Sequence, residues 1–232
     1  PKEVAEEREL ELAQLGHIIC TNASSHRMAL DVPLLLPEVN SKHIDLIDIQ
    51  REQRGWSGAL IANSNCTTMP VVMALKPLQQ FDIRKVHMVS EQAISGAGHP
   101  GVASLDIMDN VIPYVSGDED KMETETLKML GMFNGSSIED ADLITGATCT
   151  RVPVIDGHLV NISIELADKP DLKDIIEAWT SFRGESPIPF LPSSPEQPVI
   201  YLHQTDRPQI RRDRNAGKGM STSIGRLRTC PI

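Results

Sequence analysis

The segment 58–75 constrains the fold most, because it predicts a strand that passes directly into a helix. Residues 58–62 form a short apolar run, and residues 69–75 form a second one that begins with Pro70 in a first helical turn after a capping Thr67 or Thr68. Cys66 lies between the two runs. At the N-terminus of a helix, unpaired N–H groups and the helix dipole favour a thiolate. Cys66 is therefore a candidate nucleophile for attack on a carbonyl carbon.

Two simpler interpretations of Cys66 stay open. Free cysteine is among the most buried residue types, so a structural role in the core is one of them. The other is glycosylation, because residues 65–67 form an acceptor sequon. Further sequons begin at Asn22, Asn134 and Asn161, so the pattern does not single out this one.

The overall composition excludes several classes of protein. The chain has 232 residues, enough for one large or two modest domains, with 22 Lys and Arg against 32 Asp and Glu. This acidic balance argues against general nucleic-acid binding. The four cysteines form no CxxC pair, so we expect no metal site, no dense disulfide framework and a reducing, cytoplasmic compartment. No run of eighteen apolar residues predicts a membrane span.

Hydrophobic periodicity predicts helices and strands that alternate along the chain. The first part is typical of α/β proteins, and the later part predicts antiparallel strands with helices on one face. Five prolines in 184–198 predict an irregular surface connection. We expect helices at 2–15, 69–81, 101–112, 120–133 and 171–183, and strands at 17–21, 58–63, 85–91, 143–152, 158–166, 198–204 and 219–227.

Two further segments carry residues suited to chemistry at strand ends. Residues 92–98 place Gln92 and a glycine-rich turn after an apolar strand, where small residues let a ligand approach the backbone. A plain turn is the simpler interpretation of the glycines, since the spacing is not that of a dinucleotide fingerprint. Residues 151–158 join two β-like runs, and Asp156-Gly157 predicts a tight hairpin that sets Arg151 and His158 on one sheet face. Taken alone, a structural role is the simpler interpretation of each side chain.

The remaining charged motifs have an ordinary explanation. Glu125 and Lys128 form an i,i+3 pair on a predicted helix, which is usually a solvated ion pair. The run 211–214 and the turn 215–219 are typical of solvated or subunit-contacting surface.

Taken in order, these motifs resemble aspartate-β-semialdehyde dehydrogenase. The motifs are residues 64–68, 91–98, 125–128 and 151–158, and the resemblance extends over 13–232. Segments 21–28 and 213–220 resemble the branch of the family found in fungi and archaea.

The resemblance implies an activity and a set of site residues. The activity is the NADP-dependent reductive dephosphorylation of 4-phospho-L-aspartate to L-aspartate 4-semialdehyde through a cysteine thioester, in threonine, methionine, isoleucine and lysine biosynthesis. The implied catalytic residues are the nucleophile Cys66, the general acid/base His158, and Gln92, which orients the acyl intermediate. The implied binding residues are Arg151 for the substrate carboxylate, Glu125 for its amino group, Lys128 and Arg27 for phosphate, Asn22 beside the substrate, and Ser95, Gly96 and Asn215 for NADP.

The resemblance also implies a domain organisation. Complete members begin with a strand, glycine loop and helix that bind NADP, so we expect residues 1–62 to be the end of a Rossmann domain and 63–232 to be a catalytic and dimerisation domain. The expected fold class is α/β: a mixed, largely antiparallel sheet with helices on one face, like the C-terminal domain of glyceraldehyde-3-phosphate dehydrogenase. We expect a homodimer or homotetramer that does not turn over with NADP as the isolated chain.

Two rival hypotheses remain at this point. A glyceraldehyde-3-phosphate dehydrogenase relative shares the Ser/Cys/Thr/Thr junction, although Gln92 and the spacing of Arg151 and His158 favour the semialdehyde enzyme. From a different class, the chain could be a non-catalytic dimerisation module.

Overall fold

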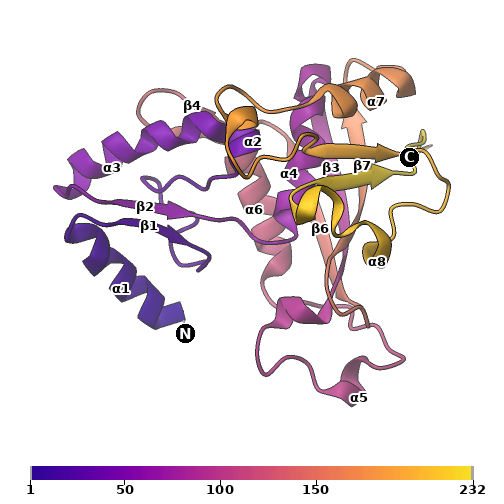
Figure 1. Cartoon of the computed structure of the whole chain (residues 1–232), viewed down its shortest axis with the longest axis horizontal. Coiled ribbons are helices and arrows are strands. Elements are labelled where there is room, and N and C mark those ends of the chain that lie inside the picture. The colour runs from indigo at the N-terminus through magenta and orange to yellow at the C-terminus, as the bar shows by residue number, and fades with distance from the viewer. Residues whose placement is uncertain (1, 231–232) are drawn as a thin grey trace.

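The computed structural model describes residues 2–230, with the early elements on one side and the later elements on the other (Figure 1). The early group contains α1 (Lys2–Gln14), β1 (Ile18–Thr21), α2 (Pro37–Asn40), η1 (Ser41–Asp45), α3 (Leu46–Arg54) and β2 (Ala59–Ala62). Strands β1 and β2 pair in parallel. Gly58 lies directly before β2. A Cβ at this position would lie 2.2 Å from the Ala13 carbonyl oxygen, so only glycine lets the end of α1 approach the strand this closely.

Helix α4 (Thr68–Leu75) follows β2 and lies at the centre of the core. Val71, Val72 and Leu75 on this helix are fully buried, as expected of a helix that is apolar on most of its surface. The indole N–H of Trp179 donates to the carbonyl oxygen of Ala74 at 2.8 Å, which ties α4 to α7 (Leu172–Ser181). Pro77 follows within η2 (Lys76–Phe81), where the regular α-helix has ended.

The later elements are built on a mixed three-stranded sheet. Strand β3 (Ile83–Gln92) is central, parallel to β6 (Ile144–Arg151) and antiparallel to β7 (Leu159–Leu166). Val86, Met88 and Ser90 point inward, and α6 (Asp118–Leu130) packs on β6 at this face. The alternate residues point outward, where Lys85 and Glu165 form an ion pair at 2.9 Å.

The other elements are short. A second parallel pair, β8 (Val199–Leu202) with β9 (Thr222–Gly225), contacts α7 and α4. No helix within residues 2–230 is both long and apolar enough to cross a bilayer. The short elements are η3 (Ile94–Ala97), α5 (Ser104–Ile107), β4 (Met132–Phe133), β5 (Ile138–Glu139), η4 (Ile188–Phe190), β8 (Val199–Leu202), α8 (Ile210–Asp213), η5 (Ala216–Gly219) and β9 (Thr222–Gly225).

Most predicted elements are confirmed, with three differences. The helix expected at 101–112 is only the single turn α5, because Leu105, Met108 and Val111 are exposed and a longer helix would have no core to pack against. The helices within 37–54 had no sequence prediction. The hairpin expected at Asp156-Gly157 is wrong: β6 and β7 do not pair with each other but flank β3. The 184–198 connection is irregular as predicted, apart from η4.

Candidate active site

Cys66 lies in the turn between β2 and α4, as the sequence predicts. Its side chain is exposed, while its neighbours Asn65 and Thr67 are buried. The helix is capped by Asn65 rather than by Thr67 or Thr68: the Asn65 side-chain oxygen accepts the Thr67 N–H at 2.8 Å, and its carbonyl accepts the Thr68 N–H at 3.1 Å. The turn therefore presents one thiol to the surface and buries the groups that shape it.

His158 reaches this thiol from the start of the segment leading into β7. Its Nε2 lies 3.2 Å from the Cys66 sulfur, and its Nδ1 accepts the Ala93 N–H at 3.0 Å. Because Nδ1 is an acceptor, the neutral ring carries its proton on Nε2 and donates it toward the sulfur. Burial, followed by the nearby positive charge of Arg151, lowers the pKa of His158 below its ordinary value. The resting pair is thus a sulfur that accepts a hydrogen bond from a neutral imidazole.

Arg151 also binds the backbone of Ala93, at its carbonyl oxygen, whereas His158 binds the N–H. Arg151 is 7% exposed, and its Nη1 donates to the Ala93 carbonyl oxygen at 2.7 Å. A Cβ on Gly96 would lie 3.2 Å from His158 Cε1 and 3.3 Å from Arg151 Nη1, so the glycine sits against both side chains. The backbone of Ala93 was not a sequence prediction, because a residue that acts through its peptide groups leaves no side-chain signal.

The sheet topology explains how Arg151 and His158 meet. Arg151 is paired with Gln92 at the end of the parallel ladder, and Leu159 is paired with Glu91 in the antiparallel one. The chain between them crosses the end of β3, where Ile94 and Ser95 donate their N–H groups to the carbonyls of Val154 and Ile155. A crossover at a strand end, rather than a hairpin, therefore brings the two residues to one place.

The remaining predicted residues divide by location. Gln92 is 1% exposed and donates to the Ser90 hydroxyl at 3.3 Å, so its amide faces the interior. Ser95 and Gly96 are exposed on η3, and Asn215 is exposed before η5. Among the described residues no group of three His, Cys, Asp or Glu side chains is placed to ligate a metal.

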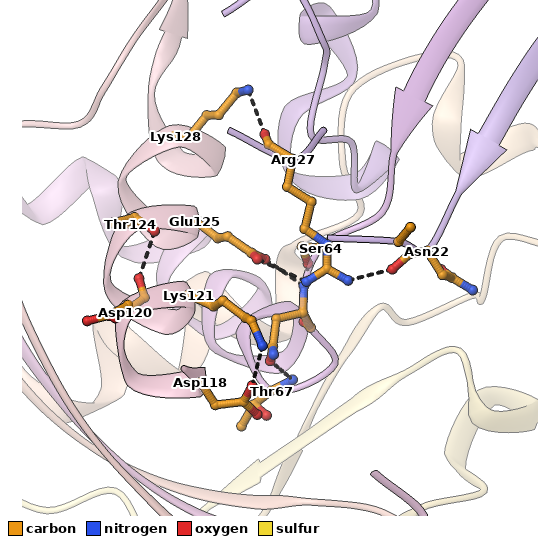
Figure 2. Close-up of polar contacts among 12 residues, drawn as sticks. Asn22, Arg27, Ser64, Thr67, Asp118, Asp120, Lys121, Thr124, Glu125 and Lys128 are labelled. Carbon is orange, nitrogen blue, oxygen red and sulfur yellow. Dashed lines mark hydrogen bonds and ion pairs between the residues drawn. The ribbon is translucent and has the colours of Figure 1, made fainter. Parts of the chain in front are cut away.

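Arg27 and Asn22 approach the back of the cysteine turn. Arg27 is buried, with Nη1 donating to Glu125 at 2.9 Å and Nη2 to the Asn22 carbonyl at 2.8 Å (Figure 2). The Arg27 Nε has no hydrogen-bond partner among the described residues. The Asn22 side chain accepts from the amide of Asn63 at 2.8 Å, and Asn63 lies in the cysteine turn.

Glu125 and Lys128 are both buried and hydrogen-bonded to the protein. Glu125 is 1% exposed, and its two oxygens accept from Arg27 and from the Asn65 N–H. Lys128 donates to the carbonyls of Arg27, Ala29 and Val32, which uses all three of its N–H groups. The solvated ion pair expected of this i,i+3 spacing is wrong, because both residues are buried in the described structure.

The fold and the site define a class of protein: an α/β chain that presents a thiol at a strand-to-helix turn, against a histidine supplied by a mixed sheet. The family described as "Semialdehyde dehydrogenase, dimerisation domain" matches residues 75–232, and "Semialdehyde dehydrogenase, NAD binding domain" matches 1–47. The chain therefore belongs to the semialdehyde dehydrogenase family.

Curated relatives and solved structures indicate which semialdehyde dehydrogenases the chain resembles. The aspartate-semialdehyde dehydrogenase of Archaeoglobus fulgidus is 49% identical over 98% of this chain and 65% of its own length, and that of Methanothermobacter thermautotrophicus is 43% identical over 98% and 66%. The crystal structure of the Candida albicans enzyme with NADP superimposes with a TM-score of 0.87 at 37% identity, covering 98% of this chain and 66% of that one. The predicted resemblance is confirmed, and the chain spans about 65% of the length of the curated relatives it matches.

Proposed function

We propose that this chain is the catalytic part of an aspartate-semialdehyde dehydrogenase, which reductively dephosphorylates 4-phospho-L-aspartate to L-aspartate 4-semialdehyde with NADP. The observation that carries the proposal is the 3.2 Å contact between His158 Nε2 and the Cys66 sulfur. The identity to enzymes of this name supports the choice of substrate over a glyceraldehyde 3-phosphate substrate. The proposed division is a nucleotide-domain segment at 1–62 and a catalytic and dimerisation domain at 63–232.

The proposed chemistry begins at Cys66. The thiolate attacks the acyl carbon of the phosphorylated substrate, a carbon–sulfur bond forms, and phosphate leaves with the electron pair of the broken carbon–oxygen bond, which gives a thioester. His158 donates a hydrogen bond from Nε2 to the oxygen that becomes negative as sulfur adds. Acting as a base instead requires His158 to release the Ala93 N–H, because a ring that accepts a proton at Nε2 must carry its other proton on Nδ1.

Further residues of the proposed site bind and orient the substrate. Arg151 has one Nη engaged with Ala93, and we propose that its remaining donors bind the substrate carboxylate. Gln92 would orient the acyl group. Arg27 and Lys128 would bind phosphate, Glu125 would bind the substrate amino group, and Asn22 would lie beside the substrate. These roles are the ones that the family resemblance implies.

The exposed turn beside His158 suits NADP. At Gly96 a Cβ would lie 3.2 Å from His158 Cε1, so the bare backbone of this turn lies close to the residue that contacts the thiol. We propose that Ser95, Gly96 and Asn215 contact the cofactor. When bound in its reduced form, NADPH, the cofactor would supply the hydride that reduces the thioester carbon. The chain spans about 65% of the length of the curated relatives, and we propose that the isolated chain does not turn over.

We further propose a homodimer formed through the outer face of the β3 sheet. This face carries small or polar residues such as Gly146, Thr148 and Ser163, which allow close approach of a second sheet. The family match to a dimerisation domain covers all three strands. Sedimentation at micromolar concentration tests this, and a monomer would contradict it. All four cysteines are free, which suits the proposed cytoplasmic compartment.

The decisive experiment joins residues 1–232 to the nucleotide-binding segment found in the longer relatives. The fusion should form NADPH from L-aspartate 4-semialdehyde only when phosphate is present, and Cys66→Ala should abolish this. Preference for glyceraldehyde 3-phosphate would favour the rival enzyme. A folded fusion with neither activity would leave a non-catalytic dimerisation module.

A further inference from the structure

The backbone directly before His158 is bound by α8, a helix with no role in the proposed reaction. Arg214, the residue after this helix, donates from Nη1 to the Asp156 carbonyl oxygen at 3.0 Å. A Cβ on Gly157 would lie 2.8 Å from Ile210 Cγ2 and 3.4 Å from Arg214 Cβ. Gly157 has φ of +88°, a conformation that favours glycine. Helix α8 therefore packs directly on the glycine that precedes His158.

The earlier part of the same segment is bound by η3. Ile94 and Ser95 donate their N–H groups to the carbonyl oxygens at 154 and 155, at 2.7 and 3.0 Å. These bonds end one residue short of Asp156. Within residues 2–230, the bond from Arg214 is the only hydrogen bond to the backbone of residues 156–157. The last peptide before His158 therefore depends on this one arginine for its hydrogen bonding to the protein.

Asp213 holds the turn from which Arg214 reaches Asp156. The Asp213 side chain is buried, and one of its oxygens accepts from Arg207 Nε at 2.8 Å and from the Gln209 N–H at 2.6 Å. The other oxygen accepts from Arg207 Nη2. Hydrogen bonding to Arg207 lowers the pKa of Asp213 below its ordinary value, so the carboxylate is ionised at neutral pH. These bonds close residues 207–213 into one turn and fix the start of α8.

We infer that Arg214 and Asp213 are positioning residues for His158. Arg214 holds the peptide of residues 156–157, which keeps His158 Nε2 at 3.2 Å from the Cys66 sulfur. Asp213 holds the turn that carries Arg214. The inference rests on the proposed function, in which Cys66 is the nucleophile and His158 is its partner. Both positioning residues act through the backbone before His158 and not by contact with the reacting atoms.

The test uses alkylation of Cys66 by iodoacetamide in the folded 232-residue chain, mapped by mass spectrometry with the exposed Cys20 as the internal reference. Arg214→Gln removes the guanidinium that binds the Asp156 carbonyl. We expect the Cys66-to-Cys20 rate ratio to fall about fivefold, the effect typical of losing one hydrogen bond. Arg214→Lys keeps the charge and a donor on a long side chain, so its ratio should fall by less than about twofold.

Two other exposed arginines are matched controls. Arg226 also donates from Nη1 to a loop carbonyl, but to that of Thr205, at 2.9 Å. Arg211 lies on α8 and carries the same charge as Arg214, but within residues 2–230 it makes no hydrogen bond to residues 152–158. Arg226→Gln and Arg211→Gln should each leave the ratio within about twofold of the unsubstituted chain. An equal fall in Arg211→Gln and Arg214→Gln would mean that positive charge alone controls the thiol, and would overturn the inference.

A double substitution tests whether Arg214 acts through His158. In a chain that carries His158→Asn, Arg214→Gln should slow Cys66 alkylation by less than about twofold, because the group that it positions is already absent. An undiminished fivefold effect would overturn the inference while leaving Cys66 as the nucleophile. A Cys66 no more reactive than Cys20 in the unsubstituted chain would overturn the proposed function, and the inference with it.

The contribution of Asp213 is tested in the same assay. Asp213→Asn keeps the size of the side chain but weakens its bonds to Arg207 and to the Gln209 N–H, so the Cys66-to-Cys20 ratio should fall. Adding Arg214→Gln to this variant should lower the ratio no further than Arg214→Gln alone. If Asp213→Asn does not fold, hydrogen exchange in the unsubstituted chain decides, because the Gln209 amide should exchange slowly when bonded to a carboxylate. Exchange at the rate of an unprotected amide would overturn the role of Asp213.

Discussion

Replacing Gly96 by alanine should disturb the His158–Cys66 pair without unfolding the protein. Gly96 has an ordinary negative-φ backbone, so alanine is not strained there, but its Cβ would lie 3.2 Å from His158 Cε1 and 3.6 Å from Nε2. Carbon atoms attract best at about 3.5–4.0 Å, so the ring must retreat by at least about 0.3 Å. The His158 Nε2 lies 3.2 Å from the Cys66 sulfur, and the displacement should lengthen this distance.

The expected loss follows from that displacement. A misplacement of about 1 Å in an active site costs about 10²-fold, so a shift of about 0.3–0.5 Å should cost about four- to tenfold. The measurement is the iodoacetamide rate of Cys66 relative to Cys20, with the free energy of unfolding in urea measured alongside. We expect the unfolding free energy to change by less than about 0.5 kcal/mol, since Gly96 is exposed.

Gly98→Ala is a control that should lower stability but leave Cys66 reactivity unchanged. Gly98 has φ of +67° and no atom within 4 Å of the added Cβ. Alanine there should destabilise the fold by about 1 kcal/mol through backbone strain, with the Cys66 ratio unchanged. If Gly96→Ala leaves the Cys66 ratio unchanged as well, the contact between His158 and the sulfur does not control reactivity, and the reasoning fails.

Three further predictions concern buried hydrogen-bonding groups. His158→Asn should slow Cys66 alkylation about tenfold or more, because the donor to sulfur is lost, while His158→Gln, whose amide reaches the Nε2 position, should slow it less. Burial lowers the pKa of His43 and of His158 below 6.5, so the folded state binds fewer protons than the unfolded state between those lowered values and pH 6.5. The free energy of unfolding should therefore fall as pH drops through this window, and His43→Gln should reduce that fall in urea titrations, whereas an identical fall would refute the assignment. Trp179→Phe should cost about 1–3 kcal/mol in the same assay, because the Ala74 carbonyl loses its buried donor, and a neutral result would contradict this.

The sequence predicted the fold well where hydrophobic periodicity was strong. The strand before Cys66 and the helix after it follow from two apolar runs, and α4 and β2 lie where expected. The sequence predicted the connection at 151–158 wrongly, because a two-residue turn signal says nothing about a third strand that inserts between the two runs. Strand β3 pairs with both runs, a long-range choice set by packing of the whole sheet.

The sequence predicted the reactive side chains of the candidate site, but not the residues that hold them in place. Cys66 and His158 were found from their residue types and motif order, and they meet in the structure. Asn65 carried a signal in retrospect, since asparagine often bonds the backbone two residues on. The family motif identified Glu125. It could not show that one carboxylate oxygen accepts the Asn65 N–H while the other accepts from Arg27.

One physical requirement links these buried residues. Loops at strand ends carry the reactive groups, yet their peptide groups have no ladder partners and must be satisfied in another way. Glu125 accepts the Asn65 N–H, and His158 and Arg151 bind the N–H and the carbonyl oxygen of Ala93. The charged Glu125 and Arg151 each gain a backbone dipole that offsets their burial. The same bonds therefore stabilise the loops and orient the thiol. Substitution of these supports should lower stability and Cys66 reactivity together, whereas substitution of an exposed residue such as Ser95 should affect only what binds there.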